Sequence, residues 1–333
     1  MQTRKLKVGV VGLGKMGLLH ASILNTLPNV ELTALCEKST LIRKMCKKLF
    51  KDLHVVADIE NLSDLGLDVV YVTTPIPSHF VVTKNIYSNK IAQNVFIEKP
   101  LAKNYDESSN LCKLAKSFGG FNMVGYMKRF AVTFRKAKDL LDNQILGDLA
   151  SFDAYAYSSD FFGTDKNSKA CTARGGVLRD LGAHVIDLSL WFFGDLEVVY
   201  SKPEQSSDFC SDTPLMFNVK RSDGLEGQFN VSWFKPNYRM PEFGLHITGS
   251  DGIMSVNDDQ VQLKLQNNEP VSWYRHDLKD NVGFQLGGPE YYREDEYFVK
   301  SLLDARKVTP DFHDAAKVDY IIDRVKFGDE IND

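Results

Sequence analysis

The chain has 333 residues, of which 43% are hydrophobic and 25% are charged. This length exceeds one ordinary hydrophobic core and predicts two domains, and the composition is that of a soluble globular protein. A formal net charge of −4 gives no basic surface for nucleic acid. No apolar run is long enough to span a bilayer, and no signal-peptide segment precedes the first expected strand. We therefore expect a cytoplasmic protein without nucleic-acid or membrane partners.

The cysteines are five in number and contain no C-x-x-C pair; they are Cys36, Cys46, Cys112, Cys171 and Cys210. Their scattered positions predict reduced thiols rather than a disulfide framework or a zinc site.

The first third of the chain alternates short apolar runs with helical patterns, which predicts a parallel sheet covered by helices on both faces. The expected strands are 7–11, 32–36, 54–56, 68–72, 95–97 and 122–124. The sequence thus predicts an α/β domain of the Rossmann type, a doubly wound parallel sheet, over residues 1–124.

The pattern changes after residue 125. Helices are expected at 131–143 and 176–193, and strands at 151–157, 215–219, 226–233, 244–248 and 261–265. Consecutive strands without intervening helices predict a mostly antiparallel sheet, and therefore an α+β domain over residues 125–333. Helices expected at 292–305 and 312–326 close the chain and can pack back on the first domain.

The most informative motif is G-x-G-x-x-G at Gly12, Gly14 and Gly17, between the first strand and the first helix. In such a motif the first glycine allows the tight turn, the second allows close approach of a pyrophosphate, and the third allows the helix to pack on the strand. Lys15 and Met16 complete this turn, where free N–H groups at the helix start face the anion. The motif predicts a dinucleotide-binding site.

Glu37 ends the second expected strand, about twenty residues beyond the glycines, where a carboxylate binds the ribose diol of NAD. Its charge would repel the 2′-phosphate of NADP, so we expect NAD to be preferred. Lys38 and Arg43 soften that repulsion, and NADP therefore stays possible. The alternative interpretation is that Glu37 is an ordinary surface carboxylate.

Three further segments carry chemical groups. Thr74, Pro75 and His79 follow the fourth strand, and Glu98 and Lys99 end the fifth. Ligands of a doubly wound sheet bind beyond the carboxyl ends of its strands, so both segments are expected to border the cofactor. The third segment places Asp180, His184 and Asp187 on one face of a helix.

Together these motifs, with G-Y-M-K-R-F at 125–130 and the region 292–298, resemble the glucose-fructose oxidoreductase / inositol dehydrogenase / MocA family of nicotinamide-dependent oxidoreductases. The resemblance implies an open-faced antiparallel sheet after the Rossmann domain, assembly into dimers or tetramers, and activity on sugars, cyclitols or related polyols. It also implies a cis peptide before the proline of Glu-Lys-Pro.

By motif, the resemblance makes Lys99, Asp180 and His184 the catalytic residues. The same three residues and Arg129 would bind the substrate. Two positions depart from the family pattern: Ile76 replaces an asparagine, which puts one cofactor hydrogen bond in doubt, and Arg174 replaces a glycine and adds charge near the substrate helix.

Elementary chemistry supports these roles. Hydride transfer from a carbinol carbon requires a base for the hydroxyl proton, and the reverse reaction requires an acid. His184 suits proton transfer near neutral pH, and Lys99 can polarise the same oxygen or act as the base itself. Asp180 can orient either residue or bind a neighbouring hydroxyl.

Other interpretations remain open for each residue. His184 can be a buried core histidine, Lys99 a solvated strand-end lysine, and Arg129 a partner in a surface or inter-domain ion pair. Asp180, His184 and Asp187 have the ligand types of a metal site, but no further donors accompany them, so no metal is expected.

The leading functional hypothesis is an NAD(P)-dependent dehydrogenase or reductase of a sugar, cyclitol or related polyol. The alternatives are a dinucleotide-binding regulator without turnover, a glycosidase that uses its cofactor transiently, and a reductase of a non-sugar carbonyl. The substrate and the direction of reaction are left open.

We also expect a homo-oligomer assembled through the second domain. Its strands carry large apolar side chains, including Phe217, Phe229, Trp233 and Leu245, and we expect one face of the sheet to expose such groups until a second copy covers them. Tyr155 and Tyr157 share a strand face, and we expect them to line the sheet core or an interface rather than to stack on a sugar.

Overall fold

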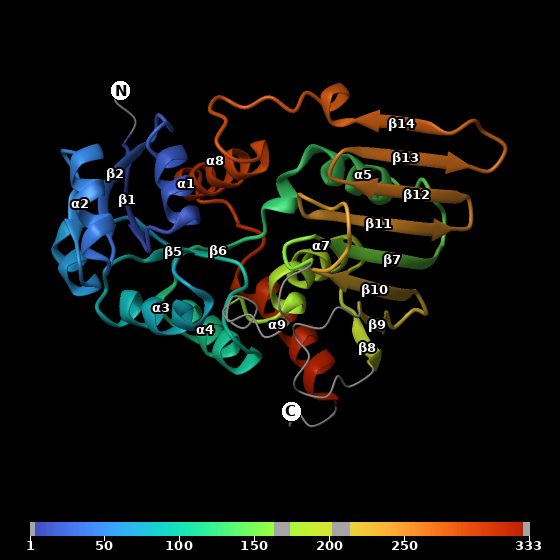
Figure 1. Ribbon diagram of the computed structural model, residues 1–333, viewed down its shortest axis with the longest axis horizontal. Coiled ribbons are helices and arrows are strands. Elements are labelled where there is room, and N and C mark those ends of the chain that lie inside the picture. The colour runs from blue at the N-terminus through green and yellow to red at the C-terminus, as the bar shows by residue number, and fades with distance from the viewer. Residues whose placement is uncertain (1–3, 163–173, 202–213, 329–333) are drawn as a thin grey trace. The chain divides into compact units, whose positions relative to one another are not determined.

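The structure is a computed structural model that describes residues 4–162, 174–201 and 214–328. By its internal contacts the described chain divides into two compact units (Figure 1). The first contains the chain up to Met127 together with Val282–Asp319, and the second contains Lys128–Asn281 and the chain from Tyr320. Each unit is built on one sheet.

The sheet of the first unit has six strands in the order β3-β2-β1-β4-β5-β6, all parallel. This is the strand order of a Rossmann fold, and it confirms the predicted fold class. Each observed strand lies within two residues of its predicted bounds. The strands are β1 (Leu6–Val11), β2 (Val30–Cys36), β3 (His54–Val56), β4 (Val69–Val72), β5 (Asn94–Glu98) and β6 (Asn122–Gly125).

The helices of the first unit connect and cover these strands. Two of them begin at side-chain caps, in which Ser39 accepts from the amide of Ile42 and Asn104 from that of Glu107. α1 packs against α8, and α3 packs against α4. The helices are α1 (Lys15–Leu24), α2 (Thr40–Leu49), α3 (His79–Ser88), α4 (Tyr105–Phe118) and α8 (Pro289–Leu303), with short 3₁₀ helices η1 (Ile59–Leu65) and η2 (Ile76–Ser78).

The sheet of the second unit has eight strands in the order β14-β13-β12-β11-β7-β10-β9-β8. Only β7 and β10 pair in parallel; the other neighbours are antiparallel, which confirms the predicted α+β class. The strands are β7 (Leu149–Tyr157), β8 (Glu197–Ser201), β9 (Leu215–Lys220), β10 (Glu226–Ser232), β11 (Glu242–Gly249), β12 (Gly252–Asn257), β13 (Gln260–Leu265) and β14 (Val271–Tyr274).

The helix predicted over 176–193 has two parts, a π-helical turn η4 (Leu178–Gly182) followed by α7 (Ala183–Phe193). π turns inside helices are uncommon and are often found at functional sites. The other helical segments are η3 (Met127–Phe130), α5 (Val132–Asp142), η5 (Arg275–Leu278) and α9 (Phe312–Phe327), which begins in the first unit and ends in the second.

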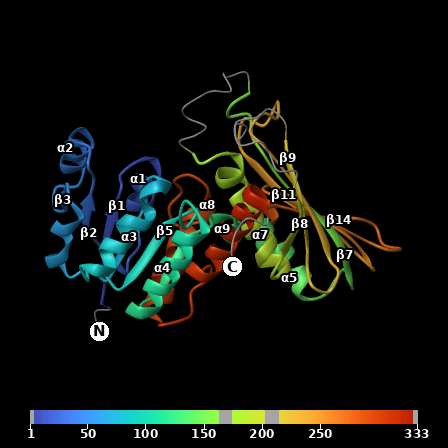
Figure 2. The same ribbon diagram turned by 90° about the horizontal axis from the view of Figure 1, so that it is seen from below.

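The eight-stranded sheet has one covered and one open face. α5 and α7 lie on one side, and the other side is uncovered by any segment that the structure describes (Figure 2). The side chains expected on the open face, those of Phe217, Phe229, Trp233 and Leu245, are at most 1% exposed and point to the covered face. That expectation was wrong because strand alternation separates two faces without showing which one the helices cover.

The open face instead carries polar and aromatic side chains. Tyr155 stacks on Tyr157 with ring centroids 5.0 Å apart, and on His246 at 5.6 Å. Tyr238 meets Tyr157 edge to face at 5.4 Å. Tyr155 and Tyr157 therefore lie on the uncovered face rather than in the sheet core.

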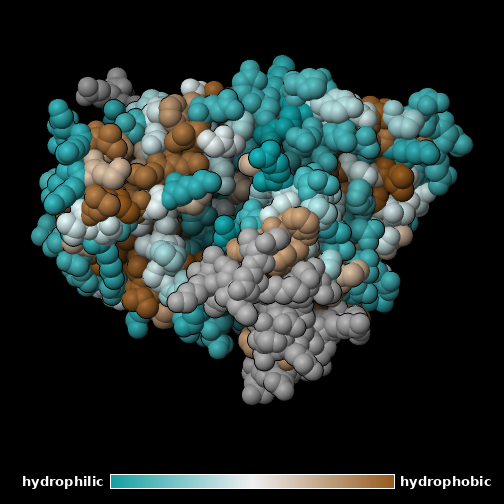
Figure 3. All heavy atoms as spheres, in the orientation of Figure 1, coloured by the Kyte–Doolittle hydropathy of each residue, from teal (hydrophilic) through white to brown (hydrophobic). Residues whose placement is uncertain are grey.

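Exposed apolar groups are found on both units, and Figure 3 shows them as separate patches among hydrophilic side chains on the visible side of the first unit. On α2, Leu41, Met45 and Leu49 are 70%, 55% and 69% exposed. Among the helices of the described ranges, none is long and apolar enough to cross a bilayer.

Three of the cysteines, Cys36, Cys46 and Cys112, are free thiols. Burial, and then the charge of Asp58, raise the pKa of Cys36 to about 12. Cys171 and Cys210 lie outside the described residues.

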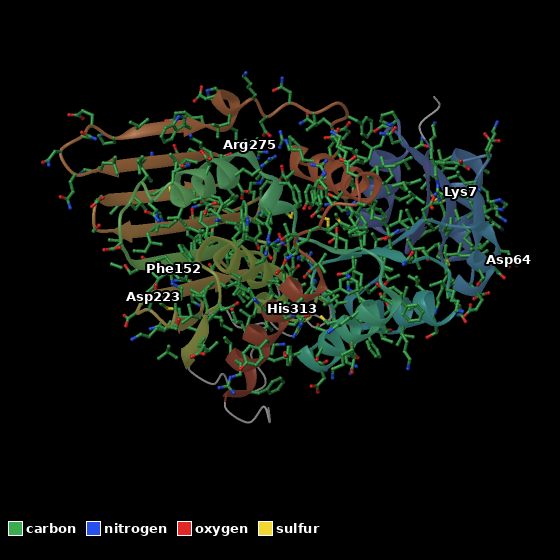
Figure 4. All side chains as sticks on the ribbon, turned by 180° about the vertical axis from the view of Figure 1, so that it is seen from behind. Lys7, Asp64, Phe152, Asp223, Arg275 and His313 are labelled. Carbon is green, nitrogen blue, oxygen red and sulfur yellow. The ribbon has the colours of Figure 1, made fainter. Side chains whose placement is uncertain are left out.

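Phe152 of β7, labelled in Figure 4, is a position on the covered face where a substitution should strongly affect stability. Its ring stacks on Phe193 of α7 at 4.2 Å and covers Gly227, where an added Cβ would lie 2.2 Å from the ring. We predict that Phe152→Ala lowers the free energy of unfolding by about 3–5 kcal/mol, because it removes the ring that joins helix to sheet. The exposed Met216→Ala should change it by less than about 0.5 kcal/mol. Chemical denaturation measures both, and equal effects would contradict this packing.

Candidate active site

The glycine turn after β1 has the geometry that its motif predicts. Gly12 has φ +92°, a conformation that favours glycine. A Cβ at position 17 would lie 1.8 Å from the carbonyl oxygen of Gly12, so α1 approaches the turn as closely as a glycine permits. A Cβ at position 14 would meet nothing within 4 Å. The space beside Gly14 is therefore open, as close approach of a pyrophosphate requires.

The helix that follows begins without a side-chain cap. Gly14 is the N-cap residue of α1, and no side chain accepts from the first amides of the helix. Lys15 is exposed and Met16 is half-buried. Free amide groups, the positive end of the helix dipole and open space thus come together at Gly14, and these residues fit a dinucleotide phosphate.

Glu37 is fixed at the end of β2 by the same turn. Its Oε2 accepts from the amide of Leu13 at 2.7 Å, and its Oε1 accepts from the amide of Ser39 at 2.8 Å. Arg43 donates to the carbonyl oxygens of Glu37 and Lys38, both at 2.6 Å. The carboxylate is therefore held beside the glycine turn rather than free on the surface, which is where the ribose of a bound dinucleotide would need it.

The ends of β4 and β5 are joined by His79. Its Nδ1 lies 2.9 Å from the carbonyl oxygen of Pro100, and its Nε2 lies 2.8 Å from that of Thr74. Burial lowers the pKa of His79, which is 1% exposed. His79 thus holds together, through backbone carbonyl oxygens, the two loops that follow β4 and β5. Thr74 is half-buried and Pro75 is exposed, so they border the loop surface.

Glu98 and Lys99 are adjacent in the chain but differ in how deeply they are buried. Glu98 is 8% exposed; its Oε2 accepts from the backbone amide of Lys99 at 3.0 Å, and its Oε1 lies 2.9 Å from Nε2 of His20. Lys99 is half-buried, and its peptide bond to Pro100 is cis, as the resemblance implied. Glu98 therefore orders the turn that carries Lys99, although it was predicted to contact the cofactor.

In the second unit, Asp180 and His184 lie on the two sides of the junction between η4 and α7. His184 is 4% exposed and meets the ring of Phe243 edge to face at 4.9 Å. Lys128 lies over the same Phe243 ring at 4.7 Å and pairs with Asp258. The π turn thus carries the half-buried carboxylate of Asp180, and the buried imidazole of His184 follows four residues later at the start of α7.

Asp180 has a cationic partner in Arg174, the residue that departs from the family pattern. Nη1 of Arg174 is 2.6 Å from Oδ2 of Asp160 and 3.3 Å from Oδ2 of Asp180. Partial burial lowers the pKa of Arg174, but the hydrogen bond that Arg174 donates to Asp160 and the charges of both carboxylates outweigh burial and raise the pKa. The guanidinium therefore compensates the negative charge at Asp180.

Arg129 forms a buried ion pair with Asp187. Its Nε and Nη2 donate to the two carboxylate oxygens at 2.8 and 2.7 Å, in the forked geometry that arginine favours. The sequence predicted either a substrate contact or an ion pair at the surface or between domains; the observed pair is instead buried within the second unit, and contact of Arg129 with substrate stays a prediction. Both carboxylate oxygens of Asp187 therefore accept hydrogen bonds from Arg129. In the part of the chain that the structure describes, no cluster of side chains is suited to a metal ion.

In the first unit, sequence reasoning missed two residues, His20 of α1 and Asp295 of α8. Nδ1 of His20 lies 2.9 Å from Oδ1 of Asp295, and both side chains are fully buried. His20 lies three residues beyond Gly17, so its closeness to the glycine motif could have drawn attention to it. No local pattern could pair it with a residue 275 positions away.

Comparison with known proteins agrees with this geometry. Residues 6–126 match the model described as "Oxidoreductase family, NAD-binding Rossmann fold", and residues 134–255 match the "GFO/IDH/MocA C-terminal domain". The chain is 24% identical to the uncharacterized oxidoreductase YrbE of Bacillus subtilis, over 60% of this chain and 58% of the relative. It is 27% identical to scyllo-inositol 2-dehydrogenase (NADP(+)) IolW of the same organism, over 57% and 52%.

The fold is also that of a solved levoglucosan dehydrogenase in complex with NADH and levoglucosan. The TM-score is 0.81 at 20% identity, and the likeness covers 97% of this chain and 96% of that one. The match to the curated relatives is narrower, since the chain spans only a little more than half of their length. Because the two family models together match most of the chain, it belongs to the glucose-fructose oxidoreductase / inositol dehydrogenase / MocA family of oxidoreductases and contains the NAD-binding Rossmann domain of that family.

Proposed function

We propose that the protein transfers a hydride between NAD and a carbinol or carbonyl carbon of a sugar, cyclitol or related polyol. The observation that carries the proposal is the position of Lys99, at the end of β5 in an NAD-binding Rossmann domain whose glycine turn leaves room for a phosphate. Relatives named as inositol dehydrogenases support the substrate class. The structural neighbour that was solved with levoglucosan also supports it.

In this proposal the chain's residues bind and orient the reactants and move one proton, and bound NAD(H) supplies or accepts the hydride. His184 takes the hydroxyl proton during oxidation and returns it during reduction. The ammonium group of Lys99 stabilises the negative charge that develops on the same oxygen. Asp180, partly neutralised by Arg174, orients the reacting groups or a neighbouring hydroxyl.

The proposal is tested by incubating the protein and NAD with a panel of sugars, cyclitols and sugar nucleotides and measuring the appearance of NADH absorbance. Turnover with at least one polyol is expected. Tight NAD binding without turnover on any member of the panel would indicate a regulator. Net hydrolysis of a glycoside without net formation of NADH would indicate a glycosidase.

The glycine turn gives a prediction with an internal control. Gly14→Val should weaken NAD binding by about tenfold or more, because its side chain occupies the space of a charged, hydrogen-bonded phosphate. Its backbone, at φ −69°, admits valine without strain, so stability should fall by only about 1 kcal/mol, from the loss of a favoured N-cap residue. Gly17→Val meets the Gly12 carbonyl and should lower stability by about 3 kcal/mol. Calorimetry of binding and unfolding distinguishes the two, and unaltered NAD affinity in Gly14→Val would reject the assignment.

The catalytic residues give a second prediction. Lys99→Ala and His184→Ala should each lower kcat by about a hundredfold or more, because both side chains act on the reacting oxygen. The dissociation constant of NAD should stay nearly unchanged, since neither side chain contacts the pyrophosphate or ribose. Steady-state kinetics and NAD titration measure the two effects. Near-normal kcat in His184→Ala would show that another group carries the proton.

Cofactor preference gives a third prediction, that NAD binds more tightly than NADP. Glu37→Ala should weaken NAD binding by about tenfold, because it removes charged hydrogen bonds to the ribose, and should improve NADP binding by removing the repulsion. Glu31→Gln, an exposed change on the same strand, is the control and should alter neither affinity. Tighter binding of NADP to the unaltered protein would contradict the role of Glu37.

A fourth prediction concerns assembly through the open face of the second unit. Aromatic groups are enriched in protein interfaces, and Tyr155, Tyr157 and Tyr238 line a hollow of about 500 Å³ on this face. Light scattering should therefore give a multiple of the 37.6 kDa chain mass. Tyr157→Glu should shift the mass toward one chain, whereas Asp223→Ala at the β9–β10 turn should not. A mass of one chain for the unaltered protein would refute the prediction.

A further inference from the structure

The first unit contains a buried charged cluster that the catalytic proposal does not use. His20 of α1 lies between Asp295 of α8 and Glu98 at the end of β5. Its Nδ1 is 2.9 and 3.0 Å from the two oxygens of Asp295, and its Nε2 is 2.9 Å from Oε1 of Glu98. His20 and Asp295 are 0% exposed, and Glu98 is 8% exposed.

The surroundings of His20 favour its charged form. Both ring nitrogens face carboxylate oxygens, so an imidazolium can donate to both sides at once. Burial would lower the pKa of His20, but the charge of Asp295 and the hydrogen bonds to Asp295 and Glu98 raise it well above its ordinary value. Aromatic rings enclose the pair, with Phe96 at 5.1 Å and Tyr71 at 5.8 Å from the imidazole.

The cluster reaches Lys99 through Glu98. One oxygen of Glu98 meets His20, and the other accepts from the backbone amide of Lys99 at 3.0 Å. An unpaired carboxylate at this depth would be costly, so the imidazole fixes where the Glu98 carboxylate sits. That carboxylate in turn fixes the start of the turn that carries the Lys99 side chain.

We propose that His20 and Asp295 are positioning residues for Lys99, which hold the Glu98 carboxylate, and through it the Lys99 backbone, in the orientation that hydride transfer requires. The proposal rests on the proposed function, because it assumes that Lys99 acts on the reacting oxygen. It extends that function to a helix, α8, that lies far from Lys99 in the sequence.

A displacement of a catalytic group by about 1 Å can cost about a hundredfold in rate. His20→Asn and Asp295→Asn should therefore each lower kcat by about tenfold to a hundredfold. The dissociation constant of NAD should change little, because the glycine turn and Glu37 are left intact. The matched control is Leu24→Ala, which removes a fully buried side chain from the same helix without touching Glu98. It should lower stability and leave kcat nearly unchanged.

A double-mutant cycle separates positioning from a general loss of structure. In a Lys99→Ala background the group to be positioned is absent, so His20→Asn should lower the residual rate by less than about twofold. Equal fold-losses in the two backgrounds would overturn the proposal. So would a normal kcat in both His20→Asn and Asp295→Asn.

A measurement without turnover keeps the inference testable if the proposed activity fails or if one variant does not fold. The amide of Lys99 donates directly to Glu98, so its hydrogen exchange, followed by NMR, reports the order of this turn. Asp295→Asn should accelerate that exchange by about tenfold or more relative to the amides of β1, and Leu24→Ala should not. Unchanged Lys99 exchange would reject the positioning role, whereas fast exchange in a protein that turns over no polyol would reject the proposed function alone.

Discussion

The close approach of α1 to the turn after β1 is the constraint on which the first unit depends. Only a glycine fits at position 17, because any Cβ there would collide with the Gly12 carbonyl. This approach places the N-cap of α1 at Gly14, beside open space that fits a phosphate, and brings the amide of Leu13 to Glu37. One turn further along the same helix, it delivers His20 to Glu98. The glycine turn and the turn that carries Lys99 are thus linked through one helix.

Buried ion pairs recur where the chain must hold a chemical group in place. His20 lies between Glu98 and Asp295, Arg129 pairs with Asp187, and Arg179 pairs with Asp323 at 2.8 Å. Such pairs are costly to desolvate and add little to net stability, but breaking one leaves an uncompensated charge. They therefore favour the one arrangement of the helices in which every buried charge has its partner. In this chain they flank the segments that carry Lys99, Asp180 and His184.

Much of the fold could be predicted because its signals are local. Alternation, apolar runs and glycine spacing each depend on a few neighbouring residues, and these predicted the six parallel strands and the start of α1. The π turn at Leu178–Gly182 was missed because its residues also fit an ordinary helix. The covered face of the second sheet was assigned wrongly because alternation in β9 and β10 does not reveal where α7 packs. The motif residues of the candidate site could be named from local spacing, and their roles stay predictions. The His20–Asp295 contact could not be named in this way, because it depends on the long-range fold that brings α8 to α1.

The central claim is that a hydride moves directly between a polyol carbon and the nicotinamide of NAD. It is tested most directly with a substrate from the active panel that carries deuterium on its carbinol carbon, followed by NMR of the recovered cofactor. The account predicts that one deuterium is found on the nicotinamide ring for each substrate molecule oxidised. Recovery of unlabelled cofactor, with the deuterium lost to solvent, would contradict it.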